Sequence, residues 1–249
     1  MIIAVDIGNT SIKIGLFADG LTDRTALTTD PLKGKPFYME LLRGIIRGRP
    51  VSGSIVSSVV PSLNRTITDV LSNFGACRPL MVDYRIRTGL KYLIEEPRRI
   101  GADRIANAVA AYDMIKGNVI VVDCGSATTL TVVDERANLL GGAIMPGMEM
   151  MCTCLKRETG ELPLVTLDIP SGALGNDTKS SIISGVLYGS AGAVERLAAE
   201  ITGTIGPSEV VLTGGNATYI KDLLRGNVYH VPDLTLSGLR LIYERNINE

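Results

Sequence analysis

The sequence predicts an α/β protein built from two similar halves. The first observation is a phrase that occurs twice, VDIGNTSIKIGLF at residues 5–17 and VDCGSATTLTVVD at residues 122–134. Both copies begin Val-Asp-x-Gly, continue with hydroxyl residues and then become apolar. Their aspartates, Asp6 and Asp123, are 117 positions apart in a chain of 249 residues. The second observation is that helical and strand patterns alternate after each copy, which is typical of α/β folds.

Each half begins with the pattern of a β-hairpin. Residues 2–8, IIAVDIG, read as a buried strand, and residues 11–17 alternate like its return arm. Gly8-Asn9-Thr10 supplies the turn between them. Residues 118–147 restart this pattern after an alanine-rich helix that ends at Gly117. Because no low-complexity linker separates the halves, we predict a packed boundary, with halves at residues 1–116 and 117–249.

The remaining patterns supply the other elements. Helical periodicity is expected at residues 36–47, 62–74, 102–117, 182–201 and 239–246, and strands at 53–61, 79–84 and 206–213. Ser62 is a plausible N-cap for the second of these helices. Residues 95–101, EEPRRIG, and residues 141–147, GGAIMPG, are expected to form loops.

Composition excludes several classes of function. The chain is 45% hydrophobic and 20% charged, which is enough for a proper core, and its net charge of -1 gives no basic face for nucleic acid. A single histidine, His230, makes a Ser-His-Asp triad or an obvious zinc site improbable. The N-terminus lacks a basic region before its apolar run, and no apolar run reaches the ~20 residues of a membrane span. We therefore expect a cytoplasmic protein that binds neither membrane nor nucleic acid.

The repeated phrase is the main candidate for chemistry. No P-loop, G-x-G-x-x-G or nucleophile-elbow motif is present. An aspartate at the end of a buried strand, followed by glycine and hydroxyls, suits a phosphate and its metal, because turn amides bind anions and glycine allows close approach. Asp6 could hold Mg²⁺ through water, and Lys13 adds a positive charge. One such turn alone would be an ordinary hairpin; two copies, with TGGN at residues 213–216, favour nucleotide binding.

A second candidate is GADR at residues 101–104, which opens the alanine-rich helix. Asp103 could act as a general base on a substrate hydroxyl, and Arg104 could bind an anionic substrate. The structural alternative is that Asp103 is only the N-cap of the helix and that Arg104 is a solvated first-turn residue. Thr178, within GNDTKSSIISG, could face a polar ligand or only cap a helix.

Together these motifs resemble a known family. DIGNTSIKIG, SSVVPSL, GADRIANAVAAY, DCGSATTLTVVD, GGAIMPG, NDTKSSIISG, VLTGGNA and the terminal LSGLRLIYERN are similar, in order, to the type III pantothenate kinases of the actin-like ATPase and sugar-kinase superfamily. The resemblance implies two ribonuclease H-like halves with mixed sheets and an interdomain cleft. It also implies ATP-dependent phosphorylation of pantothenate to 4′-phosphopantothenate, the first step of coenzyme A biosynthesis.

The resemblance also implies roles for particular residues. Asp103 would be the general base, and pantothenate would contact Gly101, Ala102, Asp103, Arg104 and Thr178, the last from the partner subunit of a homodimer with a composite active site. ATP and Mg²⁺ would be held by Asp6, Ile7, Gly8, Asn9, Thr10, Ser11, Ile12, Lys13 and Ser126, with Asp6 contacting Mg²⁺ through water. Asp123 would bind a monovalent cation, K⁺ or NH₄⁺.

Two departures and two alternatives accompany this interpretation. Many relatives have Tyr-x-Asn-Pro before GADR, whereas this chain has Ile94-Glu95-Glu96-Pro97, and Ser126 stands where threonine is usual. The alternatives are a non-catalytic accessory regulator of the same family and a kinase for another small hydroxy acid. Because Asp6, Asp103, Arg104 and Asp123 are all present, an active pantothenate kinase is favoured.

Overall fold

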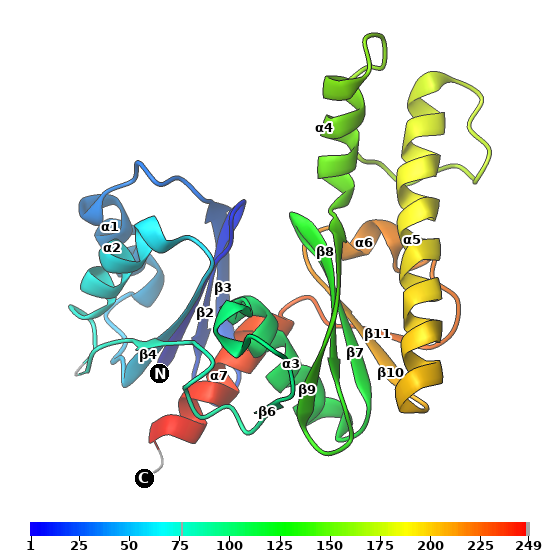
Figure 1. Ribbon diagram of the computed structural model, residues 1–249. Helices are drawn as coiled ribbons and strands as arrows, with labels where there is room; N and C mark the ends of the chain where they lie inside the picture. Colours follow the sequence, from blue (N-terminus) through cyan, green and yellow to red (C-terminus); the bar gives the residue numbers. More distant parts are fainter. Residues whose placement is uncertain (76, 248–249) are drawn as a thin grey trace. The chain divides into compact units, whose positions relative to one another are not determined.

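The computed structural model describes residues 1–75 and 77–247 and divides the chain into two compact units, each built on one mixed sheet. The first unit comprises Met1–Leu90, Ile94–Ala110 and the segment from Leu234 onward, and the second comprises Lys91–Leu93 and Ala111–Asp233. Figure 1 shows their helices and strands along the chain.

The first unit is a five-stranded sheet with the order β3-β2-β1-β4-β5. Its elements are β1 (Ile2–Ile7), β2 (Ser11–Phe17), β3 (Leu21–Thr28), α1 (Lys35–Ile46), β4 (Gly53–Ser58), α2 (Pro61–Leu71), β5 (Leu80–Met81), the 3₁₀ turn η1 (Pro97–Arg99), the start of α3 (Ala102–Ile115) and α7 (Leu234–Ile247). β1 is antiparallel to β2 and parallel to β4. The predicted hairpin is therefore confirmed.

The two faces of the first sheet have different coverings. Ile3, Val5 and Ile7 join the core that α1 and α2 supply. Because side chains alternate along a strand, Asp6 belongs to the opposite face. α7 packs on this second face: a Cβ on Gly15 of β2 would approach Leu236 of α7 to 3.1 Å. Asp6 thus projects from the sheet face that does not carry the α1–α2 core.

The second unit repeats the order of the first. Its elements are β6 (Lys91–Tyr92), the end of α3, β7 (Val119–Cys124), β8 (Ala127–Val133), β9 (Asn138–Pro146), α4 (Met148–Glu158), α5 (Thr178–Ile205), β10 (Glu209–Thr213), α6 (Ala217–Ile220) and β11 (Val228–His230). The sheet order is β11-β10-β7-β8-β9-β6. Its first five strands match β5-β4-β1-β2-β3, and β7 is likewise antiparallel to β8 and parallel to β10. The internal repeat predicted from the two phrases is therefore present in the topology.

Several boundaries differ from those expected. α2 begins at Pro61, with Val60 rather than Ser62 as its N-cap, because the fixed φ of proline suits the first helical position. Residues 141–146 of the expected GGAIMPG loop belong to β9, where the left-handed Gly142 lies so close to Leu130 of β8 that a Cβ would overlap its carbonyl. α4 and β3 had no clear sequence signal.

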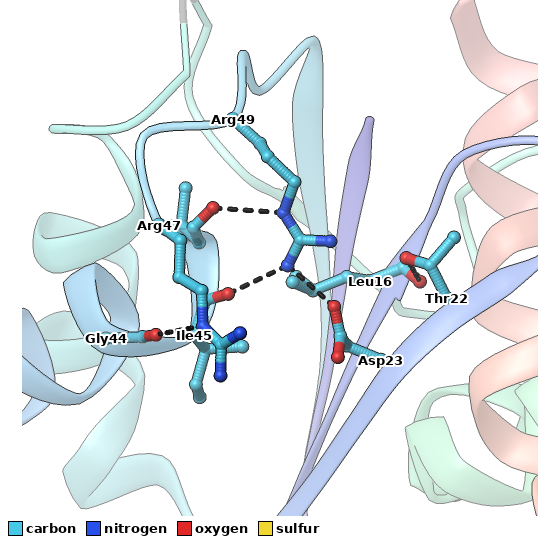
Figure 2. Close-up of polar contacts among 8 residues, drawn as sticks. Leu16, Thr22, Asp23, Gly44, Ile45, Arg47 and Arg49 are labelled. Carbon is cyan, nitrogen blue, oxygen red and sulfur yellow. Dashed lines mark hydrogen bonds and ion pairs between the residues drawn. The ribbon is translucent and has the colours of Figure 1, made fainter.

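Arg49 links the end of α1, which the sequence predicts, to β3, which it does not. Arg49, just beyond α1, donates to the carbonyls of Ile45 (2.8 Å) and Ile46 (3.0 Å). Figure 2 shows that its guanidinium also pairs with Asp23 of β3 at 2.7 Å. The arginine therefore satisfies carbonyls that the helix leaves without intrahelical donors and ties the helix end to the edge strand.

Candidate active site

The β1–β2 turn is the first part of the candidate site. The amide of Gly8 donates to the carbonyl of Ser11 at 3.0 Å. Thr29, the residue after β3, holds the turn by donating its hydroxyl to the carbonyl of Gly8 at 2.6 Å and its amide to that of Thr10 at 3.0 Å. Asn9 and Thr10 are exposed at the tip. The turn is therefore a fixed backbone loop whose polar tip is open to a ligand.

Three polar residues lie in register at the base of this turn. Asp6 is directly opposite Lys13 on β2 and Ser57 on β4, so all three project from the same sheet face. Asp6 is only 7% exposed, and a buried carboxylate needs a cation or hydrogen-bond donors. This combination of carboxylate, ammonium and hydroxyl suits the phosphates of a nucleotide and the metal that accompanies them.

GADR lies beside this turn, within the same unit. The amide of Val59 donates to the carbonyl of Ile7 at 3.0 Å, which fixes Val59 next to the end of β1. A Cβ on Gly101 would lie 3.6 Å from Cγ1 of the same Val59. The residue that follows β4 therefore brings the start of α3 close to the phosphate-type turn. Val59 belongs to the SSVVPSL motif, but nothing in that motif predicts a contact with Gly101, so the sequence alone did not reveal this connection.

Asp103 and Arg104 occupy the first turn of α3. The Oδ1 atom of Asp103 accepts a hydrogen bond from the amide of Arg104 at 2.8 Å, and both side chains are half-buried. Burial lowers the pKa of the Arg104 guanidinium, and the neighbouring Asp103 carboxylate opposes this shift. Arginine nevertheless stays protonated at neutral pH, because its ordinary pKa is so high. The start of α3 thus offers a carboxylate and a partly desolvated cation side by side.

The second phrase forms a corresponding turn in the second unit. Gly125 donates its amide to the carbonyl of Ala127 at 3.1 Å, and Ser126 is exposed at the tip. Asp123 is half-buried and lies in register between Thr129 of β8 and Thr213 of β10. It occupies the position that Asp6 has in the first sheet. The second turn is therefore rich in oxygen atoms.

Two glycines allow backbone to approach this second turn. Gly214, in the left-handed region at φ 96°, lies so close that a Cβ would be 2.5 Å from Oδ1 of Asp123. A Cβ on Gly147, the N-cap of α4, would overlap the carbonyl oxygens of Gly125 and Ser126. The TGGN and GGAIMPG motifs thus converge on Asp123 and its turn. A carboxylate enclosed by peptide groups and threonines suits a hard cation, which prefers oxygen ligands.

Thr178 is placed at a different feature of the second unit. It is the first residue of α5, where Asp177 and Ser180 form a reciprocal capping box, and its side chain is exposed. It lies at the rim of a pocket of about 930 Å³ beside α4 and α5, lined mainly by apolar residues such as Met151, Leu155 and Ile182. Asp177 caps the helix, so Thr178 remains available for a ligand or a partner.

The described residues contain neither a cluster of acidic, histidine or cysteine side chains that could hold a metal ion nor a helix that could span a membrane. Among residues 1–75 and 77–247, no group of three or more His, Cys, Asp or Glu side chains is arranged to hold a metal ion. A cation at Asp6 or Asp123 would therefore depend on substrate oxygens, peptide carbonyls, hydroxyls or water. Within the same residues, no helix is both long and apolar enough to cross a bilayer.

Comparison with solved structures identifies the fold class. A ROK family protein from Streptococcus pneumoniae covers 97% of this chain and 96% of its own, with a TM-score of 0.50 and 14% identity. The activator of 2-hydroxyisocaproyl-CoA dehydratase from Clostridium difficile, with bound ADPNP, covers 98% and 94% with a TM-score of 0.55 and 11% identity. The two mixed sheets thus have the fold of the actin-like ATPases and sugar kinases.

Sequence comparison identifies the family within this class. The family model for type III pantothenate kinase matches residues 2–200. The type III pantothenate kinases of Brevibacillus brevis and Dehalococcoides mccartyi strain CBDB1 are 38% and 37% identical to this chain, covering 99% and 98% of it and 99% and 96% of their own lengths. This chain belongs to the type III pantothenate kinase family.

Proposed function

We propose that this pantothenate kinase transfers the γ-phosphoryl group of ATP to the primary hydroxyl of pantothenate, with Asp103 as the general base. The product is 4′-phosphopantothenate, and the reaction is the first step of coenzyme A biosynthesis. The observation that carries the proposal is the contact made through Val59, which brings the start of α3, with Asp103, next to the β1–β2 turn. A base and a phosphate-binding loop held close together in one compact unit are what in-line transfer to an alcohol requires.

The start of α3 supplies the acceptor side of the reaction. Asp103 accepts the proton of the attacking hydroxyl as its oxygen bonds to phosphorus and the bond to ADP breaks. Arg104, a partly desolvated cation, pairs with the carboxylate of pantothenate, which fits the planar guanidinium in a bidentate manner. Gly101 and Ala102 complete the surface on which the substrate lies.

The nucleotide side is assigned to the two turns. In our proposal ATP contacts Asp6, Ile7, Gly8, Asn9, Thr10, Ser11, Ile12, Lys13 and Ser126. The turn amides and hydroxyls donate to phosphate oxygens, and Lys13 contributes a positive charge. When bound, Mg²⁺ neutralises the charge of the phosphates, and Asp6 would hold it through water.

Asp123 is proposed to bind a monovalent cation, K⁺ or NH₄⁺. Thr129 and Thr213 flank the carboxylate in register, and the backbone of Gly214 approaches it to the point where no side chain fits. This environment offers oxygen atoms at several positions around one negative charge, as a large, weakly hydrated cation requires.

A homodimer in the cytoplasm completes the proposal, with Thr178 contributed to the pantothenate site by the partner subunit. The segment before α5 exposes Leu164, Ile169 and Leu174 at 64%, 79% and 90%. Three large apolar side chains left exposed along one segment support an interaction surface there. Thr178 itself lines the largely apolar pocket beside α4 and α5.

The test is a kinase assay with Asp103→Asn and a matched control on the same helix. Asp113→Asn removes the same charge from α3, at a partly exposed position where Asp113 pairs with Lys116 at 2.7 Å. We expect Asp103→Asn to lower kcat by about 10²–10⁴-fold, the usual contribution of a general base. Asp113→Asn should retain the kcat of the unaltered protein.

Other outcomes would identify the alternatives. ATP binding without turnover of pantothenate would favour either the accessory regulator or a kinase for another hydroxy acid. Assaying a panel of small hydroxy acids as substrates would distinguish these two alternatives. The assay is run in K⁺, NH₄⁺ and Na⁺ buffers. Two results together would support the cation role of Asp123. The unaltered protein would be active in K⁺ and NH₄⁺ buffers but not in Na⁺, and the activity of Asp123→Asn would no longer increase with K⁺. Equal activity of the unaltered protein in all three buffers would reject the cation role of Asp123.

A further inference from the structure

Gly101 lacks a side chain where the carboxylate of Asp103 lies. An ideal Cβ on Gly101 would overlap Oδ1 of Asp103 and would lie 3.5 Å from its Cγ. On the other side, the same Cβ would meet Cγ1 of Val59 at 3.6 Å. The space next to Gly101 is therefore filled by the carboxylate proposed as the catalytic base.

The backbone of Gly101 does not itself require glycine. Gly101 is absent from the glycines that adopt a positive φ, so an alanine could take the same backbone conformation. Its carbonyl accepts the amide of Ile105 at 3.1 Å, which makes Gly101 the N-cap residue of α3. Glycine is common at an N-cap, but so are serine, threonine, asparagine and aspartate, whose side chains cap the helix. The local reason for glycine is thus space rather than backbone conformation.

The neighbouring contacts determine which group would move if a Cβ were added. Val59 is fixed by its hydrogen bond to Ile7, and Ala102 and Ile105 beside the site are buried. The carboxylate of Asp103 is the end of a short, rotatable side chain. Its Oδ1 atom would leave its present position and lose the hydrogen bond from the amide of Arg104.

We propose that Gly101 is a positioning residue for the phosphoryl transfer: its missing side chain lets the Asp103 carboxylate take the orientation in which it accepts the proton of the substrate hydroxyl. This inference rests on the proposed role of Asp103 as the base. It assigns to Gly101 an effect on the reacting geometry that does not depend on contact with substrate.

The test is a double-mutant cycle with Gly101→Ala, Asp103→Ala and the double variant. A displacement of about 1 Å in a catalytic group can cost 10²-fold, so Gly101→Ala should lower kcat by about that factor while the KM for ATP stays unchanged. In the Asp103→Ala background there is no Oδ1 to displace, so adding Gly101→Ala should change kcat by less than about twofold. Gly20→Ala is the control, because a Cβ there meets nothing within 4 Å.

The cycle separates the two proposals. Full activity of Asp103→Ala would reject Asp103 as the base, and this inference with it. If Asp103→Ala is strongly impaired but Gly101→Ala is fully active, or if the two losses simply add, the positioning role alone is wrong. Thermal unfolding covers the case in which Gly101→Ala folds poorly. Recovery of its melting temperature in the double variant would show that the overlap with Asp103 is the cause, and equal destabilisation in both would overturn the inference.

Discussion

Burial acts in opposite directions on the ionisable groups near the two turns. It lowers the pKa of Arg104, whose charged form loses solvation, and it raises the pKa of the Cys124 thiol to about 12. The neighbouring Asp123 carboxylate raises the pKa of Cys124 further, since it disfavours a second negative charge. Arg104 remains a cation at neutral pH and can recognise an anion, whereas Cys124 remains a neutral thiol and serves as a small apolar core residue.

The cysteines are therefore expected to differ sharply in reactivity. Cys77 is exposed, while Cys124 and Cys152 are 0% and 1% exposed, and burial also raises the pKa of Cys152. At pH 8 about one ten-thousandth of the Cys124 thiol would be thiolate, the reactive form. Iodoacetamide at pH 8 followed by peptide mapping should modify Cys77 in the native protein, and Cys124 and Cys152 only in urea. Modification of native Cys124 as fast as Cys77 would contradict the described burial.

At the residue scale, sequence identified the charged groups but not their surroundings. Asp6, Asp103 and Asp123 stand in short motifs whose residue types indicate phosphate and base chemistry. Val59, which brings the start of α3 next to the first turn, is an ordinary apolar residue after a strand. The chain distance between Val59 and Gly101 gives no indication that they meet, because long-range contacts depend on the whole fold.

At the scale of elements, the hairpins and amphipathic helices were predictable because their periodicity reports local burial. β3 was not, since most of its residues are exposed and its sequence, LTDRTALT, lacks an apolar face. α4 was not, because its N-cap Gly147 makes no side-chain cap and methionines and cysteines crowd its first turns. Glycine gave the least reliable signal, since at several positions it marks close approach of another element rather than a turn.

Gly238 of α7 is such a position. A Cβ there would overlap the backbone carbonyl of Ala106 in α3, within the first unit, and backbone cannot rotate away as a side chain can. Nearby, Thr235 donates to Asn107 at 2.8 Å in a buried hydrogen bond that holds the same two helices. Gly238→Ala should therefore lower the free energy of unfolding by about 1–3 kcal/mol through overpacking, as measured by urea denaturation.

Gly44→Ala is the control, because it should raise the free energy of unfolding where Gly238→Ala lowers it. Gly44 is exposed in the interior of α1, and a Cβ there meets nothing within 4 Å. Alanine should stabilise the protein by about 0.5–1 kcal/mol, because glycine is a poor helix former. If both variants were stabilised equally, the close contact between α7 and α3 would be wrong.

At the scale of the whole molecule, packing does not follow chain order. The predicted halves, residues 1–116 and 117–249, remain a prediction about the repeat, while the compact units assign α7 to the first sheet. The periodicity of α7 shows that one side of it is buried but not which sheet it covers. In the structure, Tyr243 of α7 packs against Gly53 of β4, where no side chain would fit. The last helix therefore belongs to the fold of the first repeat.

The structure of one chain does not show how subunits assemble, but the proposed composite site makes the homodimer testable. Asp103→Asn removes the base and Thr178→Trp obstructs the first residue of α5, so each variant alone should be nearly inactive. If the partner supplies Thr178, half of the dimers in an equilibrated 1:1 mixture contain both chains, and each such dimer has one intact site. The mixture should then recover about a quarter of the unaltered activity.

Mixing Asp103→Asn with the double variant should recover none, because no site in that mixture has both residues. Absence of recovery in the first mixture, in protein shown by light scattering to be dimeric, would place Thr178 and Asp103 of the same chain in one site.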